Sequence, residues 1–284
     1  MTSNKLYTPF FGLKERPFTL VPDPGFLYWS RQHKRAFSVL EFGILSGAPI
    51  TLVTGEIGSG KTTLLQELLP RIGDDVTIGL ISNAQGDRGE LIQWILNALE
   101  VEVETTASYV QMFQALQDFL LAEYAASRRV ILIFDEAQNL SIEGLEELRM
   151  LTNINSNKDV LVQLVLVGQP ELRTMVQQPE MRQLAQRVAA SFHLGKMSPE
   201  TVIRYISHRL RTAGGSGQEF SPEACAIIHR ETDGVPRLVN QLCDFAMLYA
   251  WSAEEPTIEA RTIEQVLEDE VYFGGLACPQ EEPA

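Results

Sequence analysis

The run of residues 55–62 has the residue types and the spacing of a phosphate-binding loop. It reads Gly-Glu-Ile-Gly-Ser-Gly-Lys-Thr and fits the pattern G-x-x-x-x-G-K-[ST]. Glycines in such a loop let backbone N–H groups curl around phosphate oxygens, and the following helix adds the positive end of its dipole. Lys61 would reach the β- and γ-phosphates, and the Thr62 hydroxyl would bind Mg²⁺. The predicted nucleotide-binding residues of this loop are Gly55, Glu56, Ile57, Gly58, Ser59, Gly60, Lys61, Thr62 and Thr63.

A second group of chemically suited residues follows the apolar run 130–134. Asp135 comes directly after this run and would hold Mg²⁺ through water. Glu136 is next and would polarise the water that attacks the γ-phosphate. Together with the loop, this pair predicts in-line hydrolysis of a nucleoside triphosphate. The run NKD at 157–159 is one residue shorter than the guanine-reading pattern N-K-x-D, so ATP is favoured as the substrate.

Two further polar residues are predicted to act near the γ-phosphate. Gln169 follows the apolar run 162–168, where its amide would help to place water; the alternative is a turn residue before Pro170. Arg237 ends the run GVPR at 234–237, between two predicted helices. There it would report loss of the γ-phosphate by moving a helical lid, and the alternative is an ordinary surface arginine.

A third candidate, Arg187, precedes the fifth predicted strand and would face away from the site of its own chain. An arginine finger supplied to a neighbouring subunit is the functional interpretation. Arg182 is the rival for this role. The alternative for both is a solvated basic face, because residues 182–211 carry six basic residues.

The hydropathy pattern places these residues on an alternation of strands and helices. Such an alternation predicts a parallel sheet with helices on both faces. We expect the strand before Gln169 to lie between the strands that lead to the loop and to Asp135. The expected strands are 50–55, 76–82, 130–134, 162–168 and 190–195, and the expected helices lie near 32–46, 61–69, 88–99, 109–126 and 142–152.

The pattern changes after Gly195, beyond which only helices are expected. Ser198-Pro199 and Ser221-Pro222 each offer an N-cap followed by proline at the first helical position. The predicted fold class is α/β, with a five-stranded nucleotide-binding core and a C-terminal all-helical lid. The predicted divisions are an N-terminal arm and entrance helix at 1–48 that flanks the nucleotide, the α/β core at 49–196, the helical lid at 197–272 and a disordered tail at 273–284.

Composition narrows the classes of function. The chain has 284 residues, with 23 Lys and Arg against 37 Asp and Glu, which gives a formal net charge of −14. This acidity argues against indiscriminate nucleic-acid binding, although the stretches 1–35 and 182–211 are locally basic. The sequence shows neither a secretory signal nor an apolar run long enough for a membrane helix, so we expect a cytoplasmic protein without direct membrane insertion. Three scattered cysteines, at 225, 243 and 278, do not fit a disulfide framework or a zinc site.

The order of these motifs resembles that of AAA+ ATPases. The matching runs are GEIGSGKTT, ILIFDEAQNL, LVGQPEL, the arginine before the fifth strand and GVPRLVNQL. A more specific resemblance, to the ExeA/GspA-type secretion ATPases, is carried by PFFGLKERPFTLVPDPGFLYWSRQHKRA and by YISHRL at 205–210, and it covers about residues 7–272. It implies that the segment 22–33 flanks the adenine and includes His33 as a binding residue. The alternative for His33 is a surface histidine at a helix start.

The resemblance also implies an activity and partners. It implies an ATP hydrolase with ATP and Mg²⁺ as cofactors, acting as a homo-oligomeric ring or arc with shared active sites. The expected partner is a protein of an envelope export, secretion or pilus-type complex, and contact with the inner membrane would be indirect, through that partner. The same core is similar to TniB/TnsC-type ATPases that regulate DNA transposition. DNA is therefore the second choice of partner.

Overall fold

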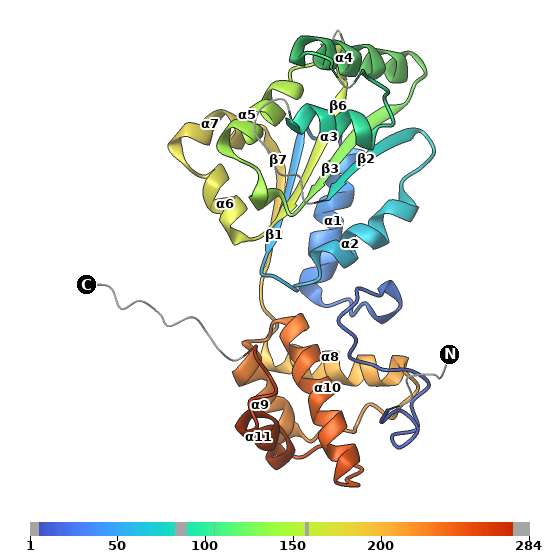
Figure 1. Ribbon diagram of the computed structural model, residues 1–284, viewed down its shortest axis with the longest axis vertical. Helices are drawn as coiled ribbons and strands as arrows, with labels where there is room; N and C mark the ends of the chain where they lie inside the picture. Colours follow the sequence, from blue (N-terminus) through green and yellow to red (C-terminus); the bar gives the residue numbers. More distant parts are fainter. Residues whose placement is uncertain (1–5, 83–89, 105, 157–158, 275–284) are drawn as a thin grey trace, which may run out of the picture. The chain divides into compact units, whose positions relative to one another are not determined.

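The computed structural model describes residues 6–82, 90–104, 106–156 and 159–274, and they form two compact units (Figure 1). The sheet-bearing unit comprises Arg31–Glu56 and Leu64–Leu194. The helical unit comprises Met1–Ser30, Ile57–Thr63 and Gly195–Ala284. The predicted tail at 273–284 falls outside the described residues beyond Gly274, as does part of the NKD run.

A five-stranded parallel sheet forms the centre of the first unit. Its order is β2-β3-β6-β1-β7, so β6 lies between β1 and β3 as predicted. Thr54 near the end of β1 pairs with Gly168 at the end of β6, and Phe134 of β3 pairs with Leu166 of β6. The carboxyl ends of these three strands therefore meet at one edge of the sheet. The strands are β1 (Ile50–Gly55), β2 (Val76–Ser82), β3 (Arg129–Asp135), β6 (Val162–Gly168) and β7 (Val188–Leu194).

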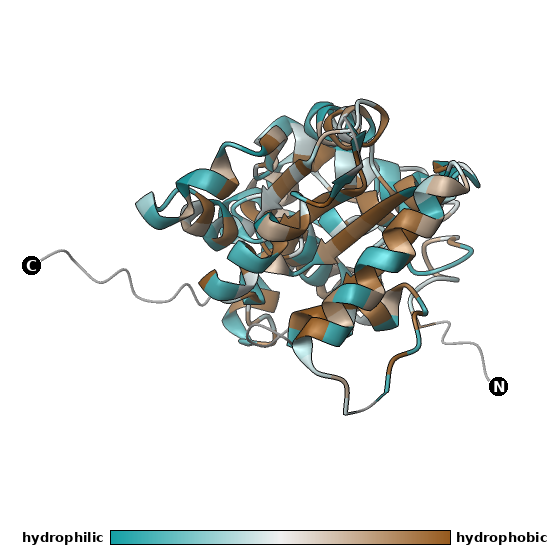
Figure 2. Cartoon of the chain, turned by 90° about the horizontal axis from the view of Figure 1, so that it is seen from above, coloured by the Kyte–Doolittle hydropathy of each residue, from teal (hydrophilic) through white to brown (hydrophobic). Residues whose placement is uncertain are grey.

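Helices cover both faces of this sheet, which confirms the predicted fold class. On one face, alternate strand residues such as Leu132 and Leu166 share an apolar core with helices α3 to α7. On the other face α1 packs on β1 and β7, and Gly43 permits this because a Cβ there would lie 2.0 Å from the Thr51 hydroxyl oxygen. The helices are α1 (Arg31–Leu45), α2 (Lys61–Leu68), α3 (Glu90–Ala98), α4 (Tyr109–Ala125), α5 (Ile142–Leu151), α6 (Pro170–Val176) and α7 (Arg182–Ala185). Figure 2 shows the strands as mostly hydrophobic ribbons between helices with mixed sides.

In the second unit, the described residues after Gly195 form four α-helices, as the predicted fold class requires. Ser198 and Ser221 are the N-caps of α8 and α9, and each accepts a hydrogen bond from a backbone N–H three residues on. Proline follows at the first helical position in both. Cys225 and Cys243 are buried in this unit as free thiols. The helices are α8 (Pro199–Thr212), α9 (Pro222–Thr232), α10 (Pro236–Ser252) and α11 (Ala260–Glu268).

The first described segment, residues 6–30, belongs to the helical unit. Four of its apolar side chains lie in the same core as the helices: Tyr7, Leu13, Phe18 and Phe26. Polar contacts add to this packing, because Tyr7 and Arg16 both bind the Asp244 carboxylate on α10. The sequence-based division at residue 48 differs from this arrangement, since the arm groups with the helices and α1 groups with the sheet.

The structure also contains elements that the hydropathy pattern did not indicate. The short strands β4 (Asn155–Ser156) and β5 (Asp159–Val160) form an antiparallel pair, and helices α6 and α7 fill the stretch between β6 and β7. These elements have two to seven residues, too few for a period to be read. No helix among the described residues is both long and apolar enough to span a membrane.

Candidate active site

The phosphate-binding pattern forms the turn between β1 and α2. β1 ends at Gly55 and α2 begins at Lys61, so the chain passes from strand to helix in five residues. Gly58 has φ +74° and Gly60 has φ +97°, a region in which residues with a Cβ are strained. The Lys61 side chain is buried, with 6% of the residue exposed. This geometry is the strand–loop–helix context that the pattern needs to cradle phosphates.

Within the helical unit, the structure brings Arg237 to this loop. Arg237 is the second residue of α10, and its backbone N–H donates to the Gly58 carbonyl at 3.3 Å. A Cβ at position 58 would lie 2.2 Å from the Cβ of Arg237, so the contact requires glycine there. Gly234, with φ +69°, sets up the approach, because a Cβ on it would lie 2.1 Å from the Met197 carbonyl oxygen. Two glycines thus position Arg237: Gly234 in the run GVPR and Gly58 in the loop.

The predicted acidic pair ends β3. Asp135 is the last residue of the strand and is 7% exposed. Glu136 follows with φ 58°, a left-handed conformation that is uncommon for a residue with a side chain. Its backbone N–H donates to Asp135 Oδ1 at 3.0 Å. The left-handed turn thus lies between the residue predicted to hold the metal and the residue predicted to act as the base.

Two glutamine amides hold the Glu136 carboxylate. Gln138 Nε2 donates to Glu136 Oε2 at 2.6 Å, and Gln169 Nε2 donates to the same oxygen at 3.2 Å. Gln138 also accepts the backbone N–H of Gln169 on its Oε1 at 2.9 Å. Gln169 is the N-cap of α6, and Gln138 lies in the 3₁₀ turn η3 (Ala137–Asn139). Within the described residues, Glu136 Oε1 receives no hydrogen bond, so this oxygen is available to a water.

Gln138 is a site residue that the sequence reasoning missed. The run DEAQN contains it two residues after Glu136, where no spacing rule marks it. Its role depends on the left-handed turn at Glu136, which directs the carboxylate toward the next turn of chain. That conformation is not indicated by residue type.

The structure gives Arg187 partners within its own chain. Its Nη1 donates to the Thr152 carbonyl at 2.9 Å and to the Thr152 hydroxyl at 3.0 Å, and its Nη2 donates to the Asn153 side chain. These contacts fasten the end of α5 to the start of β7. Arg182, the rival, is exposed at the start of α7 and has no hydrogen bond or ion pair among the described residues. His33 is buried in α1.

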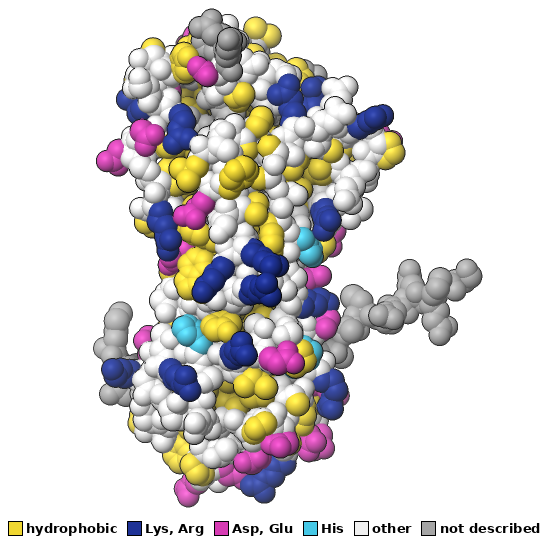
Figure 3. Space-filling view, turned by 180° about the vertical axis from the view of Figure 1, so that it is seen from behind, with side chains coloured by type: hydrophobic (Ala, Val, Ile, Leu, Met, Phe, Trp, Pro, Cys, Tyr) yellow, Lys and Arg dark blue, Asp and Glu magenta, His cyan; other side chains and the backbone are white. Residues whose placement is uncertain are grey.

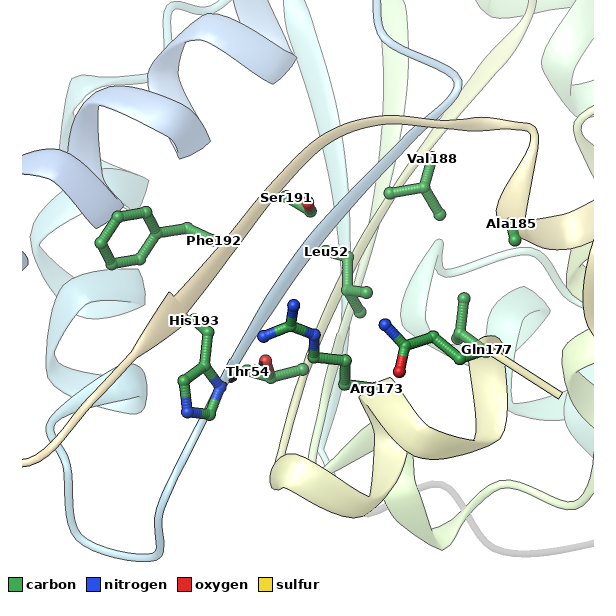
Figure 4. Close-up of a pocket in the computed structure, with 10 residues that line it drawn as sticks. Leu52, Thr54, Arg173, Gln177, Ala185, Val188, Ser191, Phe192 and His193 are labelled. Atoms are coloured by element: carbon green, nitrogen blue, oxygen red, sulfur yellow. Dashed lines mark hydrogen bonds between the residues drawn. The ribbon is translucent and has the colours of Figure 1, made fainter.

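A pocket of about 350 Å³ lies between β1, β7 and α6 in the sheet-bearing unit (Figure 4). Thr54 Oγ1 and His193 Nδ1 lie 3.0 Å apart across its floor. Arg173 and Gln177 enter it from α6, while Phe192 points away from them on the other side of β7 (Figure 4). No sequence pattern marks this pocket.

Known proteins resemble this chain in sequence or in fold. Residues 44–176 match the family model described as AAA domain. A structure of the ORC2 protein of Aeropyrum pernix, in ADPNP and ADP complexes, superposes with a TM-score of 0.65 at 18% identity, covering 91% of this chain and 72% of that one. The fold is that of the AAA+ ATPases. The Cdc6p structure from Pyrobaculum aerophilum agrees, with a TM-score of 0.68, 16% identity and coverage of 89% and 72%.

One curated relative is similar to this chain over most of the chain's length. General secretion pathway protein A of Aeromonas hydrophila is 40% identical over 247 residues, which are 87% of this chain and 45% of that protein. The resemblance inferred from the motifs is therefore confirmed by overall identity. The chain spans less than half the length of this relative.

Proposed function

We propose that this chain is an ATP hydrolase that acts as a homo-oligomer and couples hydrolysis to the assembly or remodelling of an envelope export, secretion or pilus-type complex. The observation that carries the enzymatic part is the Glu136 carboxylate held by Gln138 and Gln169 beside Asp135. The name of the 40% identical relative supports the secretion part. Any contact with the cytoplasmic face of the inner membrane would be through a partner protein.

The loop residues would bind ATP. Backbone N–H groups of the loop 55–60 and the buried Lys61 would hold the phosphates. The Thr62 hydroxyl and the Asp135 carboxylate are oxygen ligands of the kind that Mg²⁺ prefers. Mg²⁺ bound there would neutralise charge on the β- and γ-phosphates.

Glu136 would orient the attacking water through Oε1 and accept its proton. The two amides that donate to Oε2 would fix the direction of the carboxylate. Gln169 would thereby act at the γ-phosphate end of β6. Arg237, fixed to the loop at Gly58, would transmit loss of the γ-phosphate to α10.

The deciding experiment compares the wild type with Glu136→Gln. We expect the variant to bind a fluorescent ATP analogue with unchanged affinity and to lose at least about 100-fold in turnover, because general-base catalysis contributes that much. Rates should be measured against protein concentration, with and without duplex DNA. A rate per subunit that rises with concentration and ignores DNA supports the proposal. Normal turnover in Glu136→Gln would refute the assignment, and a rate that stays low until DNA is added would favour the transposition-type regulator.

A shared site also predicts complementation between subunits. We propose that an arginine, Arg187 or its rival Arg182, completes the site of the neighbour. Arg187→Ala and Arg182→Ala are each to be mixed with Lys61→Ala, whose own site cannot hold ATP. The variant that lacks the true finger arginine should be inactive alone and should regain turnover in the mixture. There its own intact phosphate-binding loop lies against a Lys61→Ala chain, which still supplies the arginine. Absence of rescue for both variants would argue against a shared site.

A further inference from the structure

A groove with a basic border lies between α1 and the edge strand β7. Its volume is about 450 Å³, and its lining is Arg31, Lys34, Arg35, Ser38, Val39 and Phe192. Phe192 alternates with Ser191 and His193 along β7, so its side chain lies on the α1 side of the strand (Figure 4). Val39 and Phe192 thus form an apolar floor with three cationic side chains around it. We call this the basic groove.

The cations of the basic groove are not neutralised by the chain itself. Arg31, Lys34 and Arg35 are all exposed, and none forms an ion pair with a residue that the structure describes. An uncompensated positive surface in a chain of net charge −14 favours an acidic partner.

The exposed face of α1 continues the groove with apolar side chains. Phe42 is 61% exposed and Leu45 is 76% exposed, and they follow Arg35 and Ser38 at helical spacing. Large apolar side chains gathered on one exposed face mark an interaction surface. The partner must therefore supply apolar as well as acidic groups.

Exposed residues of this chemistry lie on α11 and in the segment directly after it. Glu264, Glu268 and Glu270 are exposed there, and Phe273 is 72% exposed. The preceding residue, Tyr272, is buried in the core of the helical unit and anchors the segment. We call Glu264, Glu268, Glu270 and Phe273 the acidic ridge. Figure 3 shows Lys and Arg side chains beside hydrophobic ones on this face of the molecule, where Asp and Glu side chains are also present.

We propose that the basic groove of one copy receives the acidic ridge of a second copy, with Phe273 against the apolar floor. The proposal rests on the oligomer put forward above and names the surfaces that form it. A phosphate backbone would use the cations but leave the apolar floor of the groove unmatched, which favours a protein occupant over nucleic acid. Because groove and ridge are different surfaces, the contact is heterologous and repeats from copy to copy into a ring, an arc or a filament.

The first test reverses the charge of the groove. The variant Arg31→Glu/Lys34→Glu/Arg35→Glu is compared with the wild type by sedimentation velocity in the presence of Mg²⁺ and a non-hydrolysable ATP analogue. We expect the concentration needed for assembly to rise at least about 100-fold, because like charges would then face each other.

The second test reverses the charge of the acidic ridge. It uses the fact that the groove and the ridge are different surfaces, which can be altered on separate chains. The variant Glu264→Lys/Glu268→Lys/Glu270→Lys should fail to assemble alone. A one-to-one mixture of groove-reversed and ridge-reversed chains should assemble again, because each reversed surface then meets its opposite. Phe273→Ser should weaken assembly by about tenfold without any charge change.

A control variant tests whether the change in total charge alone, rather than charge at the basic groove, prevents assembly. Arg204→Glu/Arg211→Glu/Arg230→Glu alters exposed residues of α8 and α9 by the same six charges, and assembly should persist. Thermal melting of every variant shows that it is folded.

Each outcome has a distinct meaning. A wild type that stays monomeric would overturn the oligomer and this inference with it. Assembly of the wild type together with undiminished assembly of the groove-reversed chain would overturn the inference alone. Failure of the mixture to reassemble would show that another surface occupies the groove. Loss of duplex DNA binding with intact assembly would make the groove a nucleic-acid surface instead.

Discussion

Gln138 shows how one amide can set the direction of the carboxylate that we propose as the catalytic base. It donates to Glu136 Oε2 and accepts from the backbone of Gln169, so it links the ends of β3 and β6. We expect Gln138→Ala to lower kcat by about 10- to 100-fold, because a base misplaced by about 1 Å loses that much. The KM for ATP should change little, since Gln138 lies outside the phosphate-binding loop.

The matched control for this prediction is Gln186→Ala, an exposed glutamine of the same unit. It should leave kcat unchanged. Wild-type kcat in Gln138→Ala, measured by steady-state phosphate release, would show that Gln169 alone orients the carboxylate.

Residue types and spacing were sufficient to predict that 55–61 connects a strand to a helix and that Asp135 ends a strand, because a phosphate-binding pattern occurs in that context. They could not indicate Gln138 or the partners of Arg187. Those contacts depend on a left-handed turn at Glu136 and on the meeting of α5 with β7, which are set by tertiary packing.

At the scale of elements, Glu123 joins the end of α4 to the strands beside it. Arg128 donates two hydrogen bonds to its carboxylate and Thr77 of β2 donates a third. Hydrogen bonding by Arg128, against the opposing effect of burial, lowers the pKa of Glu123 from 4.5 to about 2. A carboxyl group with a depressed pKa stabilises the fold above its unfolded pKa and stops doing so as pH falls through its folded pKa.

We therefore expect Glu123→Gln to reduce the free energy of unfolding by about 1–3 kcal/mol at pH 7. The difference from the wild type should shrink as pH falls from 4.5 and vanish near pH 2. Urea titrations of both proteins across this pH range measure the free energy of unfolding and check this prediction. Glu146→Gln, which removes a carboxylate more exposed than that of Glu123 from its pair with Arg149, should cost less than about 1 kcal/mol. A pH-independent difference for Glu123→Gln would contradict the assigned cause.

The five strands of the sheet could be predicted to within two residues. The central strands β1, β3 and β6 are buried apolar runs between polar segments, whereas β2 and β7 at the edges of the sheet are only partly buried. Helix α6 could not be predicted, since proline and glutamine at 169–170 also suit a turn. In the structure the same two residues start a helix, with Gln169 as N-cap and Pro170 at its first position.

At the scale of the whole molecule, the described residues form two apolar cores, and we expect these to respond separately to mutation. Phe18→Ala should destabilise the helical unit by about 3–5 kcal/mol, because this buried ring fills the core shared with α8–α11. Hydrogen exchange should then quicken in α8–α11 and leave the strands of the sheet unaffected. Leu148→Ala should show the reverse pattern, since Leu148 lies in the core under the sheet.

Phe10→Ala is the control within the same arm, because Phe10 is 40% exposed and should cost little. Uniform loss of protection across both units in Phe18→Ala would mean that the two cores unfold as one cooperative body.

The packing of residues 6–30 against α8–α11 also determines the order in which the two units can fold during synthesis of the chain. This segment is synthesised before the sheet, yet its burial partners α8–α11 are synthesised after it. At elongation rates of about 5–20 residues per second the delay until α11 is roughly 10–50 s, ample time for the sheet-bearing unit to fold first. During that delay Tyr7, Phe18 and Phe26 have no core to enter. Nascent chains should therefore present this aromatic stretch to chaperones until translation reaches α11.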